Sequence, residues 1–231
     1  LKIKQPFLEE VSLYHEGQWS ACFHHMAANR DVVTELIKKQ VRIVPFEYHR
    51  PGLSSMSAEA GKQVSTILDR VCGKEWTKED IFFGGARGVV GQYAILGCRN
   101  RGVPFSRIHA CDVVAGTFVS QKTHMSYDTF SSKNTRKFYA ELRKCRILIL
   151  AAAGSSGTIR FLKSRHLDNL ASGTVIVQVS IDEGGNIDEP AFQRVTYWDN
   201  PSYEVAWRDK IFTVCNIPNI PGCLAPYNAS L

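Results

Sequence analysis

The sequence predicts an α/β protein with a doubly wound parallel sheet and part of a second, smaller α/β domain. Short apolar runs alternate with amphipathic stretches of helical length along most of the 231 residues. This alternation is typical of parallel sheets with helical crossovers. The glycine-rich and polar loops mostly follow predicted strands, and parallel sheets bind their ligands at that end of the strands.

The first 54 residues contain a predicted strand–helix–strand unit. Residues 1–4 resemble the end of a strand, and residues 19–25 form a further strand that ends at a histidine pair. Asn29 is expected to cap a helix with apolar positions at helical spacing, and residues 41–48 alternate as a strand does. Pro51-Gly52 then interrupts the pattern.

The remaining predicted elements continue the alternation of helices and strands. Ser57 begins a long amphipathic helix that ends at Gly73 and connects two domains. Later come a charged amphipathic helix, a strand, a further helix and two more strands; the charged helix covers 134–144, and the three strands cover 147–153, 174–180 and 211–215.

Residues 81–112 have the order strand, glycine-rich turn, helix, strand and acid. The apolar run 81–83 leads into Gly84-Gly85-Ala86-Arg87-Gly88-Val89-Val90-Gly91, and the run 108–111 ends at Asp112. This order is typical of the Rossmann fold, in which turn amides and a helix N-terminus bind a pyrophosphate and the acid binds the adenine-side ribose. We therefore expect NAD. NADP is disfavoured because a carboxylate at Asp112 repels a 2′-phosphate.

The turn departs from the usual fingerprint at two neighbouring positions. Ala86 stands where the first glycine is expected, and Arg87 either contacts phosphate or folds away from it. A structural reading also remains open, in which the turn merely connects a strand to a helix and Asp112 is a surface acid.

Composition and charge exclude several classes of protein. The chain is 44% hydrophobic and 22% charged, and it has no apolar run long enough to cross a bilayer. The net charge of +6 suits an anionic cofactor or substrate, but scattered basic residues without interleaved aromatic rings argue against nucleic acid. Seven cysteines without a CxxC pair indicate reduced core residues in a cytoplasmic protein and predict no metal site. We expect the chain to be part of a longer protein, since it begins without Met.

Several blocks of sequence, in family order and spread over nearly the whole chain, resemble the alanine dehydrogenase and transhydrogenase family. The blocks are residues 1–6, 16–18, 23–28, 56–61, 177–185, 200–203 and 219–222. The His-x-Ala-Ala block at His25 and the Ile-Asp-x-Gly-Gly block at Asp182 are fairly specific together. Gly154-Ser155-Ser156-Gly157 differs from the family's usual loop, and Gln178 lies in a strand that is usually more apolar.

The resemblance implies catalytic roles for three residues. Lys4 would hold the substrate carboxylate or polarise its carbonyl, His25 would be the general acid/base, and Asp182 would lie beside the nicotinamide ribose. His24 remains an alternative to His25. The cofactor-contacting residues expected from the turn and the resemblance together are Ser57, Gly85, Ala86, Arg87, Gly88, Val89, Val90, Gly91, Asp112, Ala153, Gly154, Asp182 and Asn219.

The resemblance also implies a domain organisation and a reaction. Residues 1–54 would be part of a substrate domain, 55–221 a Rossmann-type NAD-binding domain, and 222–231 a return to the substrate domain. The expected function is that of an NAD-dependent amino-acid dehydrogenase in a homo-oligomer, with a small-molecule 2-oxo or 2-amino acid bound between the domains and no nucleic-acid or membrane partner.

Three alternatives remain open. An opine-forming reductase, similar to saccharopine dehydrogenase or carboxyethylornithine synthase, would join a 2-oxo acid to a second amino acid with similar Lys and His groups. A transhydrogenase-type NAD-binding module would not need the Lys4 and His25 pair. A non-catalytic NAD-sensing protein would keep its function when His25 is changed to Ala.

Overall fold

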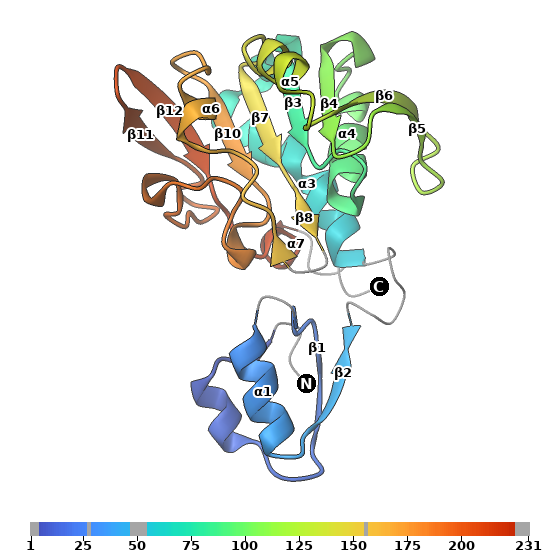
Figure 1. The fold of residues 1–231 in the computed structure, drawn as a ribbon, viewed down its shortest axis with the longest axis vertical. Helices are drawn as coiled ribbons and strands as arrows, with labels where there is room; N and C mark the ends of the chain where they lie inside the picture. Colours follow the sequence, from blue (N-terminus) through green and yellow to red (C-terminus); the bar gives the residue numbers. More distant parts are fainter. Residues whose placement is uncertain (1–4, 27–28, 47–54, 155–156, 225–231) are drawn as a thin grey trace. The chain divides into compact units, whose positions relative to one another are not determined.

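A computed structural model of the chain describes residues 5–26, 29–46, 55–154 and 157–224. The chain divides into two compact units, shown in Figure 1. The smaller unit comprises residues 1–54 together with 154–157, and the larger unit comprises residues 55–153 together with 158–231. The strand expected at residues 1–4, and with it Lys4, lies outside the described residues.

The smaller unit is built on a strand–helix–strand motif, as the sequence predicts. Strands β1 (Trp19–Cys22) and β2 (Arg42–Pro45) pair in parallel, with Trp19 opposite Arg42. Helix α1 (Arg30–Lys38) connects the two strands, and the 3-10 helix η1 (Glu9–Leu13) precedes them. A small core holds these elements together; it contains Val11, Val32, Leu36 and Val41.

The larger unit contains most of the regular structure. Its helices are α3 (Ser55–Cys72), α4 (Val89–Asn100), α5 (Thr135–Leu142), α6 (Ser164–Leu167) and α7 (Ile220–Leu224). Its main sheet consists of β3 (Ile81–Gly84), β4 (Ile108–Asp112), β5 (Gly116–Val119), β6 (Ser126–Ser131), β7 (Ile147–Leu150), β10 (Val175–Gln178), β11 (Tyr203–Trp207) and β12 (Lys210–Cys215). Two short strands, β8 (Ala153–Gly154) and β9 (Gly157–Thr158), pair with each other.

The eight strands of the main sheet lie in the order β11-β12-β10-β7-β3-β4-β6-β5. The six strands from β12 to β6 are parallel, whereas the two edge strands β11 and β5 are antiparallel to their neighbours. Counted along the chain, the parallel strands have the order 3-2-1-4-5-6 of a Rossmann sheet, and the order reverses between β3 and β7. The predicted doubly wound parallel sheet is confirmed.

Helices cover both faces of this sheet, and neighbouring strand residues therefore belong to different cores (Figure 1). Ile81 and Phe83 of β3 pack in the core that contains α3 and α4, whereas Phe82 packs in the core that contains α5 and α6. Phe82 is fully buried and makes edge-on contacts with Phe130 and Phe138. Burial on both faces explains why β3 appears in the sequence as a continuous apolar run.

The structure differs from the sequence prediction in two connections. The connection from β4 to β6 contains the antiparallel strand β5, and the antiparallel strand β11 precedes β12; the sequence predicts neither strand. The helix expected before residue 174 is the single turn α6. The charged helix expected over 134–144 is confirmed as α5, whose N-cap Asn134 accepts a hydrogen bond from Lys137 N at 3.1 Å.

Candidate functional site

The glycine-rich turn connects β3 to α4 at the carboxyl end of β3, beside the point where the strand order reverses. Gly85 has φ +82°, and a Cβ there would lie 2.7 Å from the carbonyl oxygen of Ala151. A Cβ at Gly91 would lie 2.2 Å from the carbonyl oxygen of Gly85. Only glycine fits at both positions, because the turn folds tightly on itself and against the chain after β7.

Gly88 differs from these two glycines because it faces open space. It is exposed at the N-cap of α4, has an ordinary φ of −66°, and a Cβ there would meet only the Gly85 carbonyl oxygen within 4 Å, at 3.3 Å. The next residues, Val89, Val90 and Gly91, form the first turn of α4, where backbone N–H groups lack carbonyl partners within the helix. An exposed helix N-terminus without a side chain fits a dinucleotide pyrophosphate.

Asp112 lies at the end of β4, next to the glycine-rich turn. Its Oδ2 accepts a hydrogen bond from the backbone N–H of Arg87 at 2.8 Å, and its Oδ1 accepts one from Val113 N at 2.7 Å. These two bonds fix the carboxylate against the turn, and each oxygen keeps a further lone pair for a ligand hydroxyl. The structure thus brings the glycine-rich turn and Asp112 into direct contact.

The β5–β6 hairpin holds the glycine-rich turn from the other side. The hydroxyl of Tyr127 donates to the carbonyl oxygen of Ala86 at 2.7 Å, and burial raises the pKa of this hydroxyl. Ser120 Oγ lies 2.6 Å from Gln92 Oε1, and Gln92 Nε2 donates to the carbonyl oxygen of Arg87 at 2.6 Å. The hairpin therefore fixes the conformation of the turn, a role that the sequence analysis missed.

Three further candidate residues follow other strands of the sheet. Ala153 begins β8 shortly after β7, and it is exposed. Asp182 is exposed in the short 3-10 helix Ile181–Glu183 after β10, where Gly184 ends the helix with φ +100°. Asn219 follows β12 with φ +50°, and its Oδ1 is buried without a hydrogen-bond partner in the described part of the chain. Gly154, the second residue of β8, belongs to the smaller unit.

A buried polar network supports the loop that carries Asp182. Gln178 is fully buried, and its Oε1 accepts hydrogen bonds from Asn186 N at 2.8 Å and Ile187 N at 3.1 Å. Its Nε2 donates to the carbonyl oxygen of Phe192 at 2.7 Å and to Asn216 Oδ1 at 3.0 Å. All four bonds of the side-chain amide are made, which explains how a polar residue is accommodated in this buried strand.

The histidine pair after β1 has one buried and one partly exposed member. His24 is fully buried, and its Nε2 lies 3.0 Å from Ser20 Oγ. His25 is half-buried and has φ +48°, and its carbonyl oxygen accepts a hydrogen bond from Asn29 N at 3.0 Å. Burial makes His24 a core residue, so His25 is the better candidate for proton transfer. Few non-glycine residues adopt this left-handed conformation, and those that do are often found at functional sites.

The structure says little about the remaining candidate residues. Ser57 is the third residue of α3 and is half-buried. Lys4 lies outside the described residues, as do the two serines of the loop Gly154-Ser155-Ser156-Gly157.

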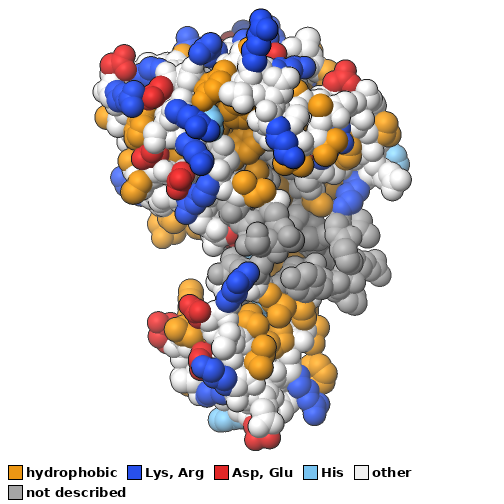
Figure 2. Space-filling view, in the orientation of Figure 1, with side chains coloured by type: hydrophobic (Ala, Val, Ile, Leu, Met, Phe, Trp, Pro, Cys, Tyr) orange, Lys and Arg blue, Asp and Glu red, His pale blue; other side chains and the backbone are white. Residues whose placement is uncertain are grey.

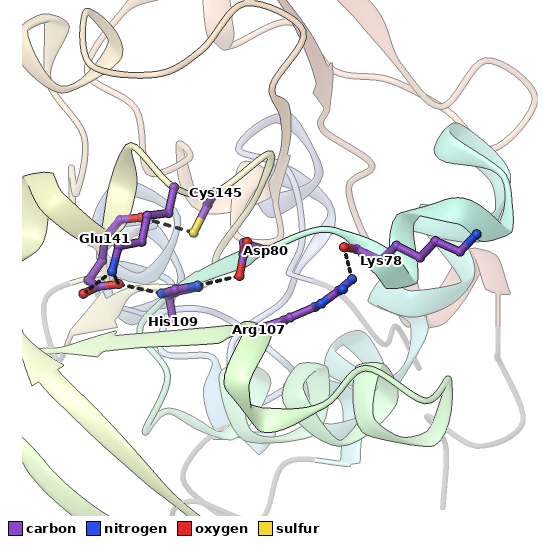
Figure 3. A network of polar contacts seen from close by, with 7 residues as sticks. Lys78, Asp80, Arg107, His109, Glu141 and Cys145 are labelled. Carbon is purple, nitrogen blue, oxygen red and sulfur yellow. Dashed lines mark hydrogen bonds and ion pairs between the residues drawn. The ribbon is translucent and has the colours of Figure 1, made fainter.

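A second polar cluster lies at the amino ends of β3, β4 and β7, away from the glycine-rich turn (Figure 3). His109 Nδ1 lies 2.7 Å from Glu141 Oε2, and His109 Nε2 lies 3.0 Å from Asp80 Oδ1. Lys144 Nζ lies 3.0 Å from Glu141 Oε2, and Cys145 Sγ donates to the carbonyl oxygen of Glu141 at 3.3 Å. These contacts fasten α5 to the sheet, so we assign the cluster a structural role.

On the face shown in Figure 2 the charged side chains do not single out a further site, and neither does the buried Cys98. Lys and Arg side chains are distributed over the face of the larger unit shown in Figure 2, together with Asp and Glu. Burial raises the pKa of the Cys98 thiol to about 12, which leaves it protonated and unreactive. Within the described residues, no helix is long and apolar enough to cross a membrane, and no His, Cys, Asp and Glu side chains gather into a group suited to a metal ion.

Curated relatives of this chain are alanine dehydrogenases. The protein of Methanococcus maripaludis is 25% identical over 245 residues, which cover 97% of this chain and 63% of the relative. The protein of Bacillus subtilis is 25% identical over 224 residues, which cover 88% of this chain and 58% of the relative. The chain therefore spans about three fifths of the length of these relatives.

Solved structures share the fold of this chain. A transhydrogenase from Sinorhizobium meliloti superposes with a TM-score of 0.67 at 20% identity, covering 100% of this chain and 69% of that one. An L-alanine dehydrogenase superposes with a TM-score of 0.62 at 20% identity, covering 100% of this chain and 66% of that one. The A chain of dipicolinate synthase from Bacillus subtilis also has a TM-score of 0.62, at 10% identity, with 97% of this chain and 64% of that one covered.

A family model identifies the larger unit directly. The model described as "Alanine dehydrogenase/PNT, C-terminal domain" matches residues 73–231. The match begins where α3 ends and includes the glycine-rich turn, Asp112, Asp182 and Asn219. Together with the sheet order and the geometry of the turn, it shows that this chain belongs to the alanine dehydrogenase/PNT C-terminal domain family.

Proposed function

We propose that the protein is an NAD-dependent amino-acid dehydrogenase, which interconverts a 2-amino acid with a 2-oxo acid and ammonia. The observation that carries the proposal is the contact between Asp112 Oδ2 and the backbone N–H of Arg87, which joins the acid to the glycine-rich turn. Family membership and the alanine dehydrogenase relatives support an oxidoreductase. The nicotinamide cofactor, when bound, supplies the hydride chemistry. The protein must bind and orient the cofactor and the substrate, and it must move protons.

The residues around the glycine-rich turn support NAD as the cofactor. The first turn of α4 provides backbone N–H groups for a pyrophosphate, and the exposed Gly88 leaves room for it. The carboxylate of Asp112 accepts hydrogen bonds from ribose hydroxyls and repels a 2′-phosphate. Val89, Val90, Gly91 and the turn residues Gly85 and Ala86 form the framework of this site.

The proposed proton chemistry uses His25. Loss of a proton from the amine and attack of water on the imine both need a base that titrates near neutral pH, as imidazole does. His25 is half-buried whereas its neighbour His24 is fully buried, which supports His25 as the acid/base. By resemblance to the family, Lys4 binds the substrate carboxylate or carbonyl as an ammonium ion, and Asp182 lies beside the nicotinamide ribose.

The larger context of the enzyme also follows from the resemblance. We propose that residues 1–54 belong to a substrate domain, that residues 55–221 bind NAD, and that residues 222–231 return to the substrate domain. Ser57, Ala153, Gly154 and Asn219 are proposed cofactor contacts. We further propose a cytoplasmic homo-oligomer, as the family resemblance and the free cysteines indicate.

The test is a steady-state assay of the full chain that follows NADH absorbance. Pyruvate and a panel of other 2-oxo acids are each supplied with ammonia alone, with a second amino acid alone, or with neither. We expect NADH oxidation with ammonia alone, and we expect His25→Ala to lower it by about 10²- to 10⁴-fold. The matched variant His24→Ala reports the effect of losing the buried histidine of the same pair.

Each of the other outcomes would contradict the proposed reaction or the proposed role of His25. Oxidation only with a second amino acid would establish an opine-forming reductase. Tight NADH binding without turnover in any mixture would support a cofactor-binding module, as in a transhydrogenase or an NAD-sensing protein. Full activity of His25→Ala would remove that residue from the mechanism.

A further inference from the structure

Arg87 raises a question about cofactor selectivity, because it places a cation in the glycine-rich turn next to Asp112. An arginine near this acid is the usual means by which a Rossmann site accommodates the 2′-phosphate of NADP. The selectivity of this site therefore depends on where the guanidinium group of Arg87 is held.

The guanidinium group of Arg87 is bound to the β5–β6 hairpin. Its Nε and Nη2 lie 3.0 and 2.8 Å from Thr129 Oγ1, and Nη2 also donates to the carbonyl oxygen of Gly116 at 3.0 Å. The guanidinium carbon lies 5.3 Å from the centre of the Phe118 ring, within cation–π distance. Four contacts from three residues of one hairpin thus restrain this long side chain.

Thr129 is the central residue of this arrangement. It is 5% exposed, and its hydroxyl also lies 3.0 Å from the carbonyl oxygens of Val114 and Gly116. The hydroxyl proton can be donated to either of these carbonyl oxygens, so the two oxygen lone pairs are available to the guanidinium group. Thr129 therefore has a fixed orientation and accepts from Arg87 at a defined position.

Only the backbone of Arg87 contacts Asp112, through the N–H bond to Oδ2. The carboxylate receives its other hydrogen bond from Val113 N, so within the described residues both of its hydrogen-bond donors are neutral amides. Its negative charge is consequently left to act on the ligand. A restrained Arg87 and a fixed Asp112 together disfavour a 2′-phosphate and favour a free 2′-hydroxyl.

We propose that Thr129 is a specificity-determining residue, which keeps the site selective for NAD by holding Arg87 on the β5–β6 hairpin. The proposal rests on the proposed binding of a nicotinamide dinucleotide at this turn. Loss of the Thr129 hydroxyl releases the guanidinium group, which then reaches the ribose end of the site and pairs with a 2′-phosphate. Residue 129 thus controls selectivity through residue 87, without contacting the cofactor.

The test compares the dissociation constants of NADH and NADPH, measured by nicotinamide fluorescence titration of the full chain. Thr129→Val keeps the β-branched shape and removes the acceptor oxygen. We expect this variant to narrow the preference for NADH over NADPH about tenfold, a change of about 1.4 kcal/mol in relative binding. The double variant Thr129→Val/Arg87→Ala should restore the wild-type preference, because no released guanidinium group remains.

A matched control separates the effect of losing the hydrogen bonds between Thr129 and Arg87, here called the latch, from general damage to the β5–β6 hairpin. Thr117→Val makes the same substitution at an exposed position of β5, where the hydroxyl contacts Asp128 at 2.7 Å and not Arg87. This variant should keep the wild-type preference. A folded Thr129→Val protein with an unchanged preference would overturn the proposal, and so would a double variant whose preference stays narrowed.

A further variant keeps the proposal testable if Thr129→Val does not fold. Arg87→Ala keeps the backbone N–H that binds Asp112 and removes only the guanidinium group. On this proposal the restrained guanidinium group makes no contact with the 2′ position, so the variant should keep the preference for NADH over NADPH. A selective loss of NADPH affinity in this variant would show that Arg87 already binds the 2′-phosphate, which would overturn the latch. Failure of the wild-type protein to bind either dinucleotide is a separate result, and it would overturn the proposed function together with the latch.

Discussion

Two glycines of the same turn, Gly88 and Gly91, should respond to alanine in opposite ways. At Gly91, the new Cβ would lie 2.2 Å from the Gly85 carbonyl oxygen and 2.9 Å from Ala86 Cα. Both neighbours are backbone atoms, so the turn must shift. At Gly88, the Cβ would meet only one carbonyl oxygen, at 3.3 Å, and it would otherwise face open space above the first turn of α4.

The magnitudes follow from these contacts. Overpacking at Gly91 costs about 1–3 kcal/mol of folding free energy, of which the better helix propensity of alanine recovers about 0.5–1 kcal/mol. Because the new Cβ would lie 2.2 Å from a backbone oxygen, the upper end of this cost applies, and the net loss is about 2 kcal/mol. We therefore expect Gly91→Ala to lower the melting temperature by roughly 4–8 °C. Gly88→Ala should change folding stability by less than about 1 kcal/mol, since only the N-cap preference and the unfolded-chain entropy change.

The two variants should also differ in cofactor binding. A methyl group at Gly88 occupies the space in which a pyrophosphate would approach the first-turn N–H groups of α4. Loss of one hydrogen bond to a charged group costs about 1.5–3 kcal/mol, so the affinity for NADH should fall at least about tenfold. Thermal melts and NADH titrations of both proteins provide the check. Unchanged NADH affinity in a stable Gly88→Ala protein would contradict pyrophosphate binding above Gly88, and full stability of Gly91→Ala would contradict the tight packing of the turn.

Three further predictions concern the core, the pH dependence of stability and the acid/base residue. Phe82→Ala removes a fully buried ring from the face that packs against α5, so urea unfolding should show a loss of about 3–5 kcal/mol, and a loss below 1 kcal/mol would contradict this packing. Burial raises the pKa of the Glu141 carboxyl, but hydrogen bonds and charge from Lys144 and His109 outweigh it and hold this pKa below its usual value of 4.5. Because the folded-state pKa is depressed, the ionised carboxylate stabilises the fold above pH 4.5, and this stabilisation is lost as the pH falls through the folded-state value. Glu141→Gln should therefore flatten the acid limb of a stability–pH curve, and an unchanged limb would show that this group does not contribute. His25→Ala should lower turnover about 10²- to 10⁴-fold while its dissociation constant for NADH stays within about twofold, and parallel losses of both would indicate a structural role.

The sequence predicts the central features of the fold because their signals are local. Strand β3, the glycine-rich turn, α4, β4 and Asp112 follow one another within about 30 residues, the length of one βαβ unit. The parallel order of the strands follows from the alternation of apolar runs and helices.

The parts that were missed depend on contacts between distant residues. The bonds between Arg87 and Thr129 span 42 positions, and the bond between Gln178 and Asn216 spans 38. Nothing in a single sequence indicates which residues meet over such distances. A local signal for the hairpin does exist, since residues 117–119 and 127–130 are rich in the β-branched and aromatic residues that favour strands.

The choice between His24 and His25 shows the same limit at shorter range. His24 and His25 both follow the last residue of β1, and the left-handed backbone of His25 turns the chain there, so strand alternation does not decide which of the two is buried. The sequence gives no indication of which face is buried. The structure resolves it, because Ser20 lies four residues earlier and pairs with the buried His24.

The most direct measurement is a crystal structure of the full chain with NADH. We expect the pyrophosphate to lie on the first turn of α4 above Gly88, and the adenine-side ribose hydroxyls to lie within hydrogen-bond distance of Asp112. Arg87 should remain on Thr129 in that complex. NADH bound away from the glycine-rich turn, or a ribose that does not contact Asp112, would contradict the assignment of this site.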